Sequence, residues 1–125
     1  PLPVYGATGV EAVVAGFNTA YAQDAVYRHE HHGDTVAPGS GAGMQAIQFA
    51  APELGELQTL IDDGEVKIEM LAVEHSPVKP AVGYRFSYKG RSLLITGDTV
   101  KFANIEKFAQ GVDLLVHEAL APQPG

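Results

Sequence analysis

The chain of 125 residues contains no cysteine and no tryptophan. Without cysteine it forms neither disulfides nor thiolate metal sites. The absence of cysteine fits both an oxidising and a reducing compartment. No apolar run approaches the roughly 20 residues that a membrane span needs, and no signal peptide is visible. Basic residues are few: 8 Lys and Arg stand against 15 Asp and Glu, which gives a net charge of −7. This balance argues against a broad electrostatic grip on nucleic acid.

What is present suffices for a folded core. Hydrophobic residues make up 46% of the chain and charged residues 18%, so the composition is not that of a disordered protein. The length suits one domain. Because the chain starts at Pro1 without a methionine, we expect its N-terminus to be processed, truncated or incomplete.

One short apolar run, at residues 92–99, ends in the carboxylate of Asp98. Two further runs end in polar groups: residues 66–73 lead to His75, and residues 112–116 lead to His117 and Glu118. Such runs predict buried strands. Because ligands of α/β sheets bind beyond the carboxyl ends of strands, we expect His75, Asp98 and His117 to share one rim.

The remaining elements follow from local patterns. Thr8 and Glu11 form a capping box that predicts a helix to about residue 23, with its apolar stripe in the core. We expect a strand at 25–32, then an irregular loop at 33–56 with at most one helical turn at 44–49. The loop is either a variable insertion or a lid over a substrate.

The second half reads as mostly sheet. Asp-Gly at 63–64 predicts a hairpin over 57–73 with residues 65, 67 and 69 facing solvent. A strand at 83–88 turns at Lys89-Gly90 into the strand at 92–95. Asn104 is the expected N-cap of a short helix at 105–110. A crossover then places the strand at 112–116 parallel to 92–95. The expected class is therefore α/β, a mixed sheet with two helices.

Two groups of residues invite a metal interpretation. His29, His31 and His32 cluster at 29–32, but a polar strand end explains them better. The rim at the strand ends offers imidazole and carboxylate, which suit zinc, manganese or iron. A carboxylate can bridge two cations, and a pair of metals lowers the pKa of bound water to about 7. Alternatively each rim residue is an ordinary turn or strand-end group with a structural role.

Three segments carry a resemblance to a known family. They read His-Ser-Pro-Val-Lys-Pro-Ala-Val-Gly-Tyr-Arg-Phe at 75–86, Gly-Asp-Thr at 97–99 and Leu-Val-His-Glu-Ala at 115–119, with support at 2–6 and 27–33. In this order they resemble the second half of a metallo-β-lactamase-fold hydrolase, most of all its ribonuclease Z and arylsulfatase-like branch.

The resemblance implies a role for each position. His75 matches a metal-binding histidine of the family, and Asp98 matches the aspartate that bridges two zinc ions. His117 and Glu118 match a pair that assists proton transfer to the leaving group, so His117 is implied to be catalytic and not a metal ligand. His29, His31 and His32 fall on positions that bind no metal.

The family pattern also extends past this chain. Its H-x-H-x-D-H motif would precede Pro1 and its last metal histidine would follow Gly125. The family fold, a four-layer αββα sandwich, is longer than this chain. We therefore expect one partial domain: 1–32 ends the first half, 33–56 is an irregular loop, and 57–125 is part of the second half.

The expected function is part of a metal-dependent hydrolase that cleaves a phosphodiester or sulfate ester with a metal-activated water. The chain alone is expected to be inactive, with its metal absent or partial. His75 and Asp98 lie 23 positions apart (98 − 75), which leaves no room for the tRNA-gripping arm of short bacterial ribonuclease Z proteins. We therefore expect a small ester substrate, with neither nucleic acid nor membrane as partner.

Two further expectations concern assembly and an alternative function. A half-sandwich exposes a sheet face that its other half covers, so we expect a homo-oligomer or pairing with the missing half. The alternative is a metal-free binding or scaffolding module with a degenerate site.

Overall fold

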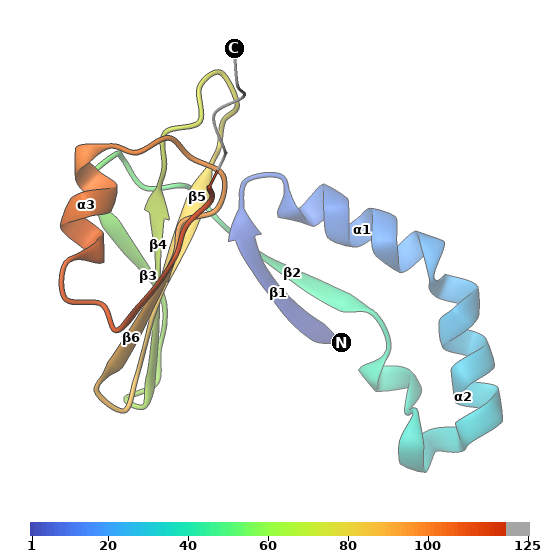
Figure 1. Cartoon of the computed structure of the whole chain (residues 1–125). Coiled ribbons are helices and arrows are strands. Elements are labelled where there is room, and N and C mark those ends of the chain that lie inside the picture. The colour runs from blue at the N-terminus through green and yellow to red at the C-terminus, as the bar shows by residue number, and fades with distance from the viewer. Residues whose placement is uncertain (120–125) are drawn as a thin grey trace. The chain divides into compact units, whose positions relative to one another are not determined.

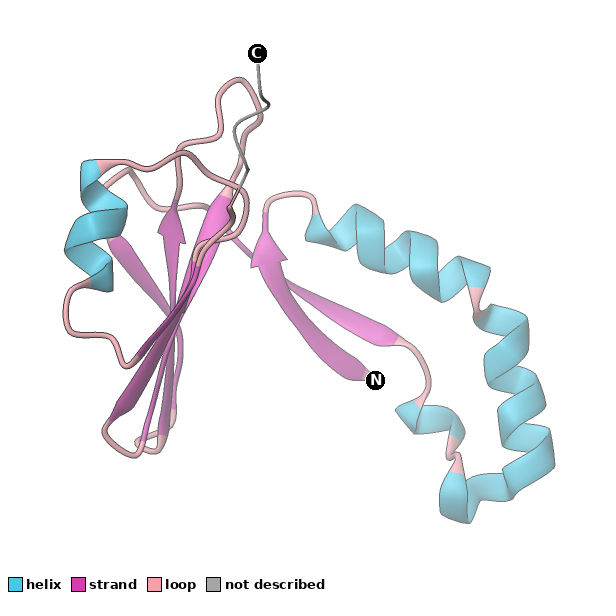
Figure 2. Ribbon diagram, viewed as in Figure 1, coloured by secondary structure: helices cyan, strands magenta, loops and turns pink. Residues whose placement is uncertain are grey.

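A computed structural model describes residues 1–119 of the chain. The chain divides into two compact units, Pro1–Ala50 and Ala51–Gly125, and each contains its own β-sheet. Figures 1 and 2 show the helices and strands of both. Within residues 1–119, no helix combines the length and the apolar character that crossing a bilayer requires.

The first unit is a parallel pair of strands joined by helices. β1 (Leu2–Ala7) pairs with β2 (Met44–Phe49) from Leu2↔Met44 to Ala7↔Phe49. The connection runs through α1 (Val10–Ala20), α2 (Ala22–Val36) and the 3-10 turn η1 (Gly39–Gly41), and α1 packs against both strands. The predicted loop at 33–56 is therefore wrong, because β2 lies within it. Its pairing partner is far away in sequence, so no local pattern indicates it.

Helix α1 begins differently from the prediction. Its N-cap is Gly9, in a left-handed conformation with φ of 106°, and no side chain caps the helix. The Gly9 N–H instead donates to Gln48 Oε1 at 2.8 Å, so the capping box of Thr8 and Glu11 is wrong. Only Val14 of this helix is buried, whereas Phe17 stays half-exposed. Of the apolar stripe, only Val14 is therefore fully covered by the described residues.

Helix α2 replaces the strand predicted at 25–32, which makes three α-helices in residues 1–119 instead of two. The segment is rich in residues that tolerate a helix and has a single β-branched residue, Val26, before Gly33. Arg28 and Asp24 form an i,i+4 ion pair at 2.6 Å. Gly33, with φ of 70°, interrupts the helical path.

The second unit is a five-stranded mixed sheet in the order β3-β4-β5-β6-β7. Its strands are β3 (Leu57–Asp62), β4 (Val66–Ala72), β5 (Val82–Tyr88), β6 (Arg91–Ile95) and β7 (Leu114–Val116). The first four are antiparallel and β7 is parallel to β6, which confirms the α/β class, both hairpins and the parallel last strand. At the first hairpin Asp63 Oδ1 accepts the N–H groups of Glu65 and Val66, at 2.9 and 2.7 Å.

The core of this unit lies between the sheet and helix α3 (Ala103–Ala109), which covers one face (Figure 1). The buried side chains are those of Leu71, Val73, Leu94, Ile105 and Phe108. The N-cap of α3 is Phe102, not the predicted Asn104. The N-cap therefore differs from the prediction, but the helix forms and packs against β6 through the core residues.

The order of strands decides where their polar ends meet. β4 and β6 are both antiparallel to β5, and β7 is parallel to β6. The three strands β4, β6 and β7 therefore run in the same direction, and their carboxyl ends reach the same edge of the sheet. This is the edge from which His75, Asp98 and His117 emerge.

Candidate active site at the carboxyl ends of β4, β6 and β7

Backbone hydrogen bonds join the three strand ends. Thr96 N–H donates to the Val116 carbonyl at 3.1 Å, which extends the pairing of β6 and β7. Val100 N–H and Thr99 Oγ1 both donate to the Glu74 carbonyl, each at 3.0 Å. The loop after β6 is thus fixed to the end of β4 on one side and to the end of β7 on the other.

His75 and Asp98 meet in this loop. Nε2 of His75 lies 2.9 Å from Oδ2 of Asp98, with 32% of the histidine side chain and 74% of the aspartate side chain exposed. Within the described residues, Nδ1 of His75 is buried and has no hydrogen-bond partner. The structure therefore brings the two expected metal ligands together, and Asp98 is the group that orients the imidazole.

The two residues line a hollow of about 460 Å³. Its walls are formed by Glu74, His75, Ser76, Asp98, Thr99, Val100 and Glu118. The Glu74 carboxylate accepts hydrogen bonds from the hydroxyl and the backbone N–H of Ser76, and these bonds hold the pKa of Glu74 below its usual range. Three carboxylates and one imidazole therefore border the hollow.

His117 and Glu118 hold the end of β7 by different contacts. Nδ1 of His117 lies 2.7 Å from Oγ1 of Thr96, whereas Oε1 of Glu118 accepts the N–H of Thr99 at 2.5 Å. The Glu118 carboxylate thus binds the loop after β6, and the hydroxyl of Thr96 is the partner of the His117 ring. The catalytic roles of both residues stay predictions.

Thr96 and Thr99 were not singled out in the sequence. Both are buried, with 0% and 3% of their surface exposed. The contact between Thr96 and His117 follows from the parallel pairing of β6 and β7. Ile95 lies opposite Val116, so the next residues on the two strands are Thr96 and His117. In the sequence, however, a threonine that contacts a histidine in this way looks the same as any threonine at the end of a strand.

The donor types at this edge fit zinc, but their number does not complete a site. Zinc accepts imidazole nitrogen and carboxylate oxygen, and protein sites supply three or four such ligands. Residues 1–119 contain no group of three or more His, Cys, Asp or Glu side chains placed to hold a metal. His75 and Asp98 would supply two ligands, and any others must come from beyond the described residues.

The histidines of α2 are separate from this site. His29 Nδ1 lies 2.9 Å from the Ala37 carbonyl and 3.7 Å from Asp34, while His31 and His32 contact each other edge-on at 4.5 Å. The 29–32 cluster thus belongs to a helix and not to a polar strand end, and it provides no metal site.

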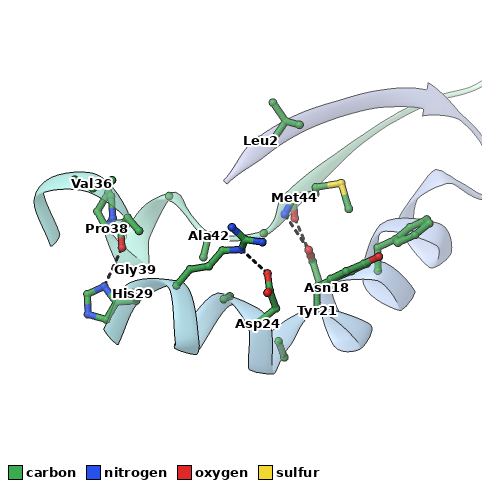
Figure 3. A pocket seen from close by; sticks show the side chains of 17 residues that line it. Leu2, Asn18, Tyr21, Asp24, His29, Val36, Pro38, Gly39, Ala42 and Met44 are labelled. Carbon is green, nitrogen blue, oxygen red and sulfur yellow. Dashed lines mark hydrogen bonds and ion pairs between the residues drawn. The ribbon is translucent and has the colours of Figure 1, made fainter. Parts of the chain in front are cut away.

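The first unit has a larger hollow, of about 760 Å³, between α1, α2 and η1 (Figure 3). Four of its polar side chains have partners: Arg28 pairs with Asp24, His29 contacts the Ala37 carbonyl, and Asn18 bonds to the backbone of Met44. Most of the remaining lining is apolar.

Comparison with known proteins gives consistent results. The chain is 33% identical over 120 residues to a ribonuclease Z of Mycobacterium avium (strain 104), which covers 96% of this chain and 40% of that protein. It is 32% identical over 120 residues to a putative ribonuclease Z of Mycobacterium tuberculosis (strain CDC 1551 / Oshkosh), covering 96% of this chain and 50% of that protein. The chain thus spans about 40% to 50% of the length of these relatives.

Among solved structures, the chain is similar to Zn(2+)-bound PqqB from Methylobacterium extorquens. The TM-score is 0.52 with 13% sequence identity, over 92% of this chain and 36% of that one. A likeness at this identity concerns the fold. No family model matches the chain.

Proposed function

Since the chain is ribonuclease Z-like in sequence and has a metallo-β-lactamase-type fold, we propose that its protein is a metal-dependent hydrolase of ester bonds. The observation that carries this proposal is the meeting of His75 and Asp98 at 2.9 Å, beside a hollow bordered by carboxylates. Two side chains that a zinc site uses converge there from separate loops, which a structural turn does not require.

In this proposal His75 and Asp98 would hold the metal, which when bound would supply a water of lowered pKa and polarise the ester. The chain's own residues hold the geometry: the Thr99 hydroxyl and the Val100 N–H fix the Asp98 loop against the carbonyl of Glu74. Two zinc ions per protein remain part of the proposal.

His117 is the proposed proton donor to the leaving group. Its ring is held at Nδ1 by Thr96, which leaves Nε2 to exchange a proton. Glu118 contributes by binding the Thr99 N–H, which keeps the end of β7 next to the loop that contains Asp98. In this proposal Glu118 positions the site and does not itself transfer the proton.

The proposed substrate is a phosphodiester. The expectation that nucleic acid is no partner finds no support in the relatives, whose name, ribonuclease Z, makes RNA the first candidate. The net charge of −7 and the short interval between His75 and Asp98 favour a small phosphodiester or a sulfate ester instead. RNA and a small phosphodiester are therefore the two substrates of the test.

One observation favours the second candidate, a metal-free binding module. Within residues 1–119 no three potential ligands gather around one point. For the isolated chain we propose weak metal binding and no turnover. Stoichiometric zinc together with turnover by these 125 residues would contradict that part of the proposal.

The test uses the product of the complete reading frame, purified and analysed for zinc, with an RNA and a small aryl phosphodiester as substrates. We expect zinc-dependent cleavage of at least one of them, and a loss of about a hundredfold or more for Asp98→Ala. Asp34→Ala, which removes an exposed carboxylate on α2, is the matched control and should keep full activity. A metal-free product without turnover would support the binding module, and activity unchanged in Asp98→Ala would contradict the proposed role of Asp98 in the site.

A further inference from the structure

Thr96 is a fully buried hydroxyl between two partners. Its side chain follows β6 and has 0% of its surface exposed. Oγ1 donates a hydrogen bond to the Gly97 carbonyl at 3.1 Å and lies 2.7 Å from Nδ1 of His117. Because the Thr96 side chain is closed to water, no water molecule donates a hydrogen bond to it. The protons in its two contacts must therefore come from the Thr96 hydroxyl and the His117 ring.

The hydroxyl has one proton, and this decides the direction of each bond. A carbonyl oxygen only accepts, so the contact with Gly97 requires the proton of Thr96. The contact with His117 then requires a proton on Nδ1, which the ring donates to Oγ1. If the hydroxyl proton pointed to Nδ1 instead, the oxygens of Thr96 and Gly97 would face each other at 3.1 Å without a proton between them.

We propose that Thr96 is the positioning residue of His117 and that it holds the imidazole in the tautomer protonated on Nδ1. The catalytic consequence rests on the function proposed above. As a cation the ring has protons on both nitrogens, and it gives the Nε2 proton to the leaving oxygen of the ester. The ring is then neutral with its proton on Nδ1, which is the tautomer that Thr96 stabilises. No proton has to move within the ring between turnovers.

The backbone around Thr96 leaves it little freedom. Its N–H is bonded to the Val116 carbonyl, and a Cβ on Gly83 of the neighbouring strand would lie 2.9 Å from the Thr96 carbonyl oxygen. The glycine therefore allows β5 to approach closely at this point. Because β5 and β7 hold Thr96 from both sides, the position of its hydroxyl is fixed, and this hydroxyl in turn fixes the position of the His117 ring.

The tautomer is measured directly by ¹⁵N NMR of the chain with labelled histidine, at about pH 8.5, two units above the ordinary pKa of the side chain. The His117 signals are assigned by their absence from His117→Asn. We expect Nδ1 to show the shift of a protonated nitrogen and Nε2 that of an unprotonated one, the reverse of what free histidine in water favours. A wild-type ring protonated on Nε2 would overturn the proposal without any further variant.

Two substitutions test whether Thr96 is the cause. Thr96→Val keeps the shape and removes the hydroxyl, so we expect His117 to revert to the tautomer of free histidine. Thr96→Ser keeps the hydroxyl and should keep the wild-type signals. A Thr96→Val chain that retains the Nδ1-protonated ring would also overturn the proposal.

A measurement of activity provides a second test, which distinguishes a failure of the Thr96 proposal from a failure of the proposed hydrolase function. In the product of the complete reading frame, Thr96→Val should lower kcat about ten- to a hundredfold with little change in KM, and Thr96→Ser should restore it. If the NMR result holds and the protein cleaves no ester, the proposed function fails while the tautomer assignment stands. If the protein is active and Thr96→Val leaves kcat unchanged, the positioning role fails.

Discussion

Nε2 of His75 lies 2.9 Å from Oδ2 of Asp98, although their strands, β4 and β6, are separated in the sheet by β5. No strand pairing forces the two loops to meet. They meet because Thr99 and Val100 donate hydrogen bonds to the carbonyl of Glu74, directly before His75. The contact between His75 and Asp98 thus depends on the loop after β6 and on its hydrogen bonds to the end of β4.

Leu94 is the residue of β6 on which the second unit most depends. It is completely buried, against Leu71 and the helix residues Ile105 and Phe108. Leu94→Ala leaves a cavity, and we expect it to lower the free energy of unfolding by about 3 kcal/mol. Urea unfolding followed by circular dichroism measures the change. Leu54→Ala, at a residue 49% exposed, should cost less than about 1 kcal/mol; equal losses for both variants would contradict this placement of the core.

Gly83 is required by the close approach of β5 and β6. A Cβ there would lie 2.8 Å from the Ile95 carbonyl oxygen and 2.9 Å from that of Thr96. Both are backbone atoms, so we expect Gly83→Ala to cost about 1–3 kcal/mol in the same urea measurement. It should also disturb the His117 ring signals, since Thr96 has to move. Ser87→Ala on the same strand adds no atoms and is the control; a Gly83→Ala chain as stable as that control would show that the sheet is looser than described.

The parts of the fold that could be predicted are those with local causes. The Asp63-Gly64 and Lys89-Gly90 turns indicate their hairpins because the turns themselves need these residues. Strand β2 was missed since its partner is β1, which lies far away along the chain. The 25–32 segment was expected to be a strand, whereas the structure has it within helix α2, in line with its residues that tolerate a helix.

The candidate site shows the same division. Strand direction alone was enough to place His75, Asp98 and His117 at one edge. The detailed contacts were not predictable, because which hydroxyl meets which ring depends on the register of β6 and β7. Similarly, Glu69 was expected in solvent, but Arg85 lies opposite it in the register and covers it. Side-chain partners across strands are set only once the sheet has formed.

Glu69 gives the second unit a stability that depends on pH. Burial raises its pKa, but the hydrogen bonds and charges of Lys67 and Arg85 outweigh this, so the net pKa is lowered. A carboxyl with a lowered pKa stabilises the fold above its unfolded pKa, about 4.3, and this stability is lost as the pH falls further. We expect Glu69→Gln to cost about 2 kcal/mol at neutral pH and much less near pH 3.

The comparison is made by urea unfolding at both pH values. Glu65→Gln, at an exposed residue directly before the same strand, is the matched control and should cost little at either pH. A penalty for Glu69→Gln that stays constant down to pH 3 would mean that the contacts with Lys67 and Arg85 do not depend on its charge.

Strand β7 is an edge of the described sheet, and its residues are exposed. Leu114 is 57% exposed, Leu115 44% and Val116 48%. An apolar edge strand pairs readily with another chain, so we expect the isolated chain to self-associate as its concentration rises. Leu115→Lys should shift the mass measured by light scattering toward the monomer, whereas Val78→Lys, at an exposed loop residue, should not. A wild-type monomer at high concentration would count against this expectation.

The most direct test of the His75–Asp98 site is a zinc titration of the chain with the histidine side chains observed by NMR. We expect the signals of His75 to respond at the lowest zinc concentration, and Asp98→Asn to weaken this response about tenfold or more. His32→Ala, which removes an exposed imidazole of α2, should leave the His75 response unchanged. If the first signals to respond are instead those of the α2 histidines, or if Asp98→Asn binds zinc as tightly as the wild type, then His75 and Asp98 are not a metal site.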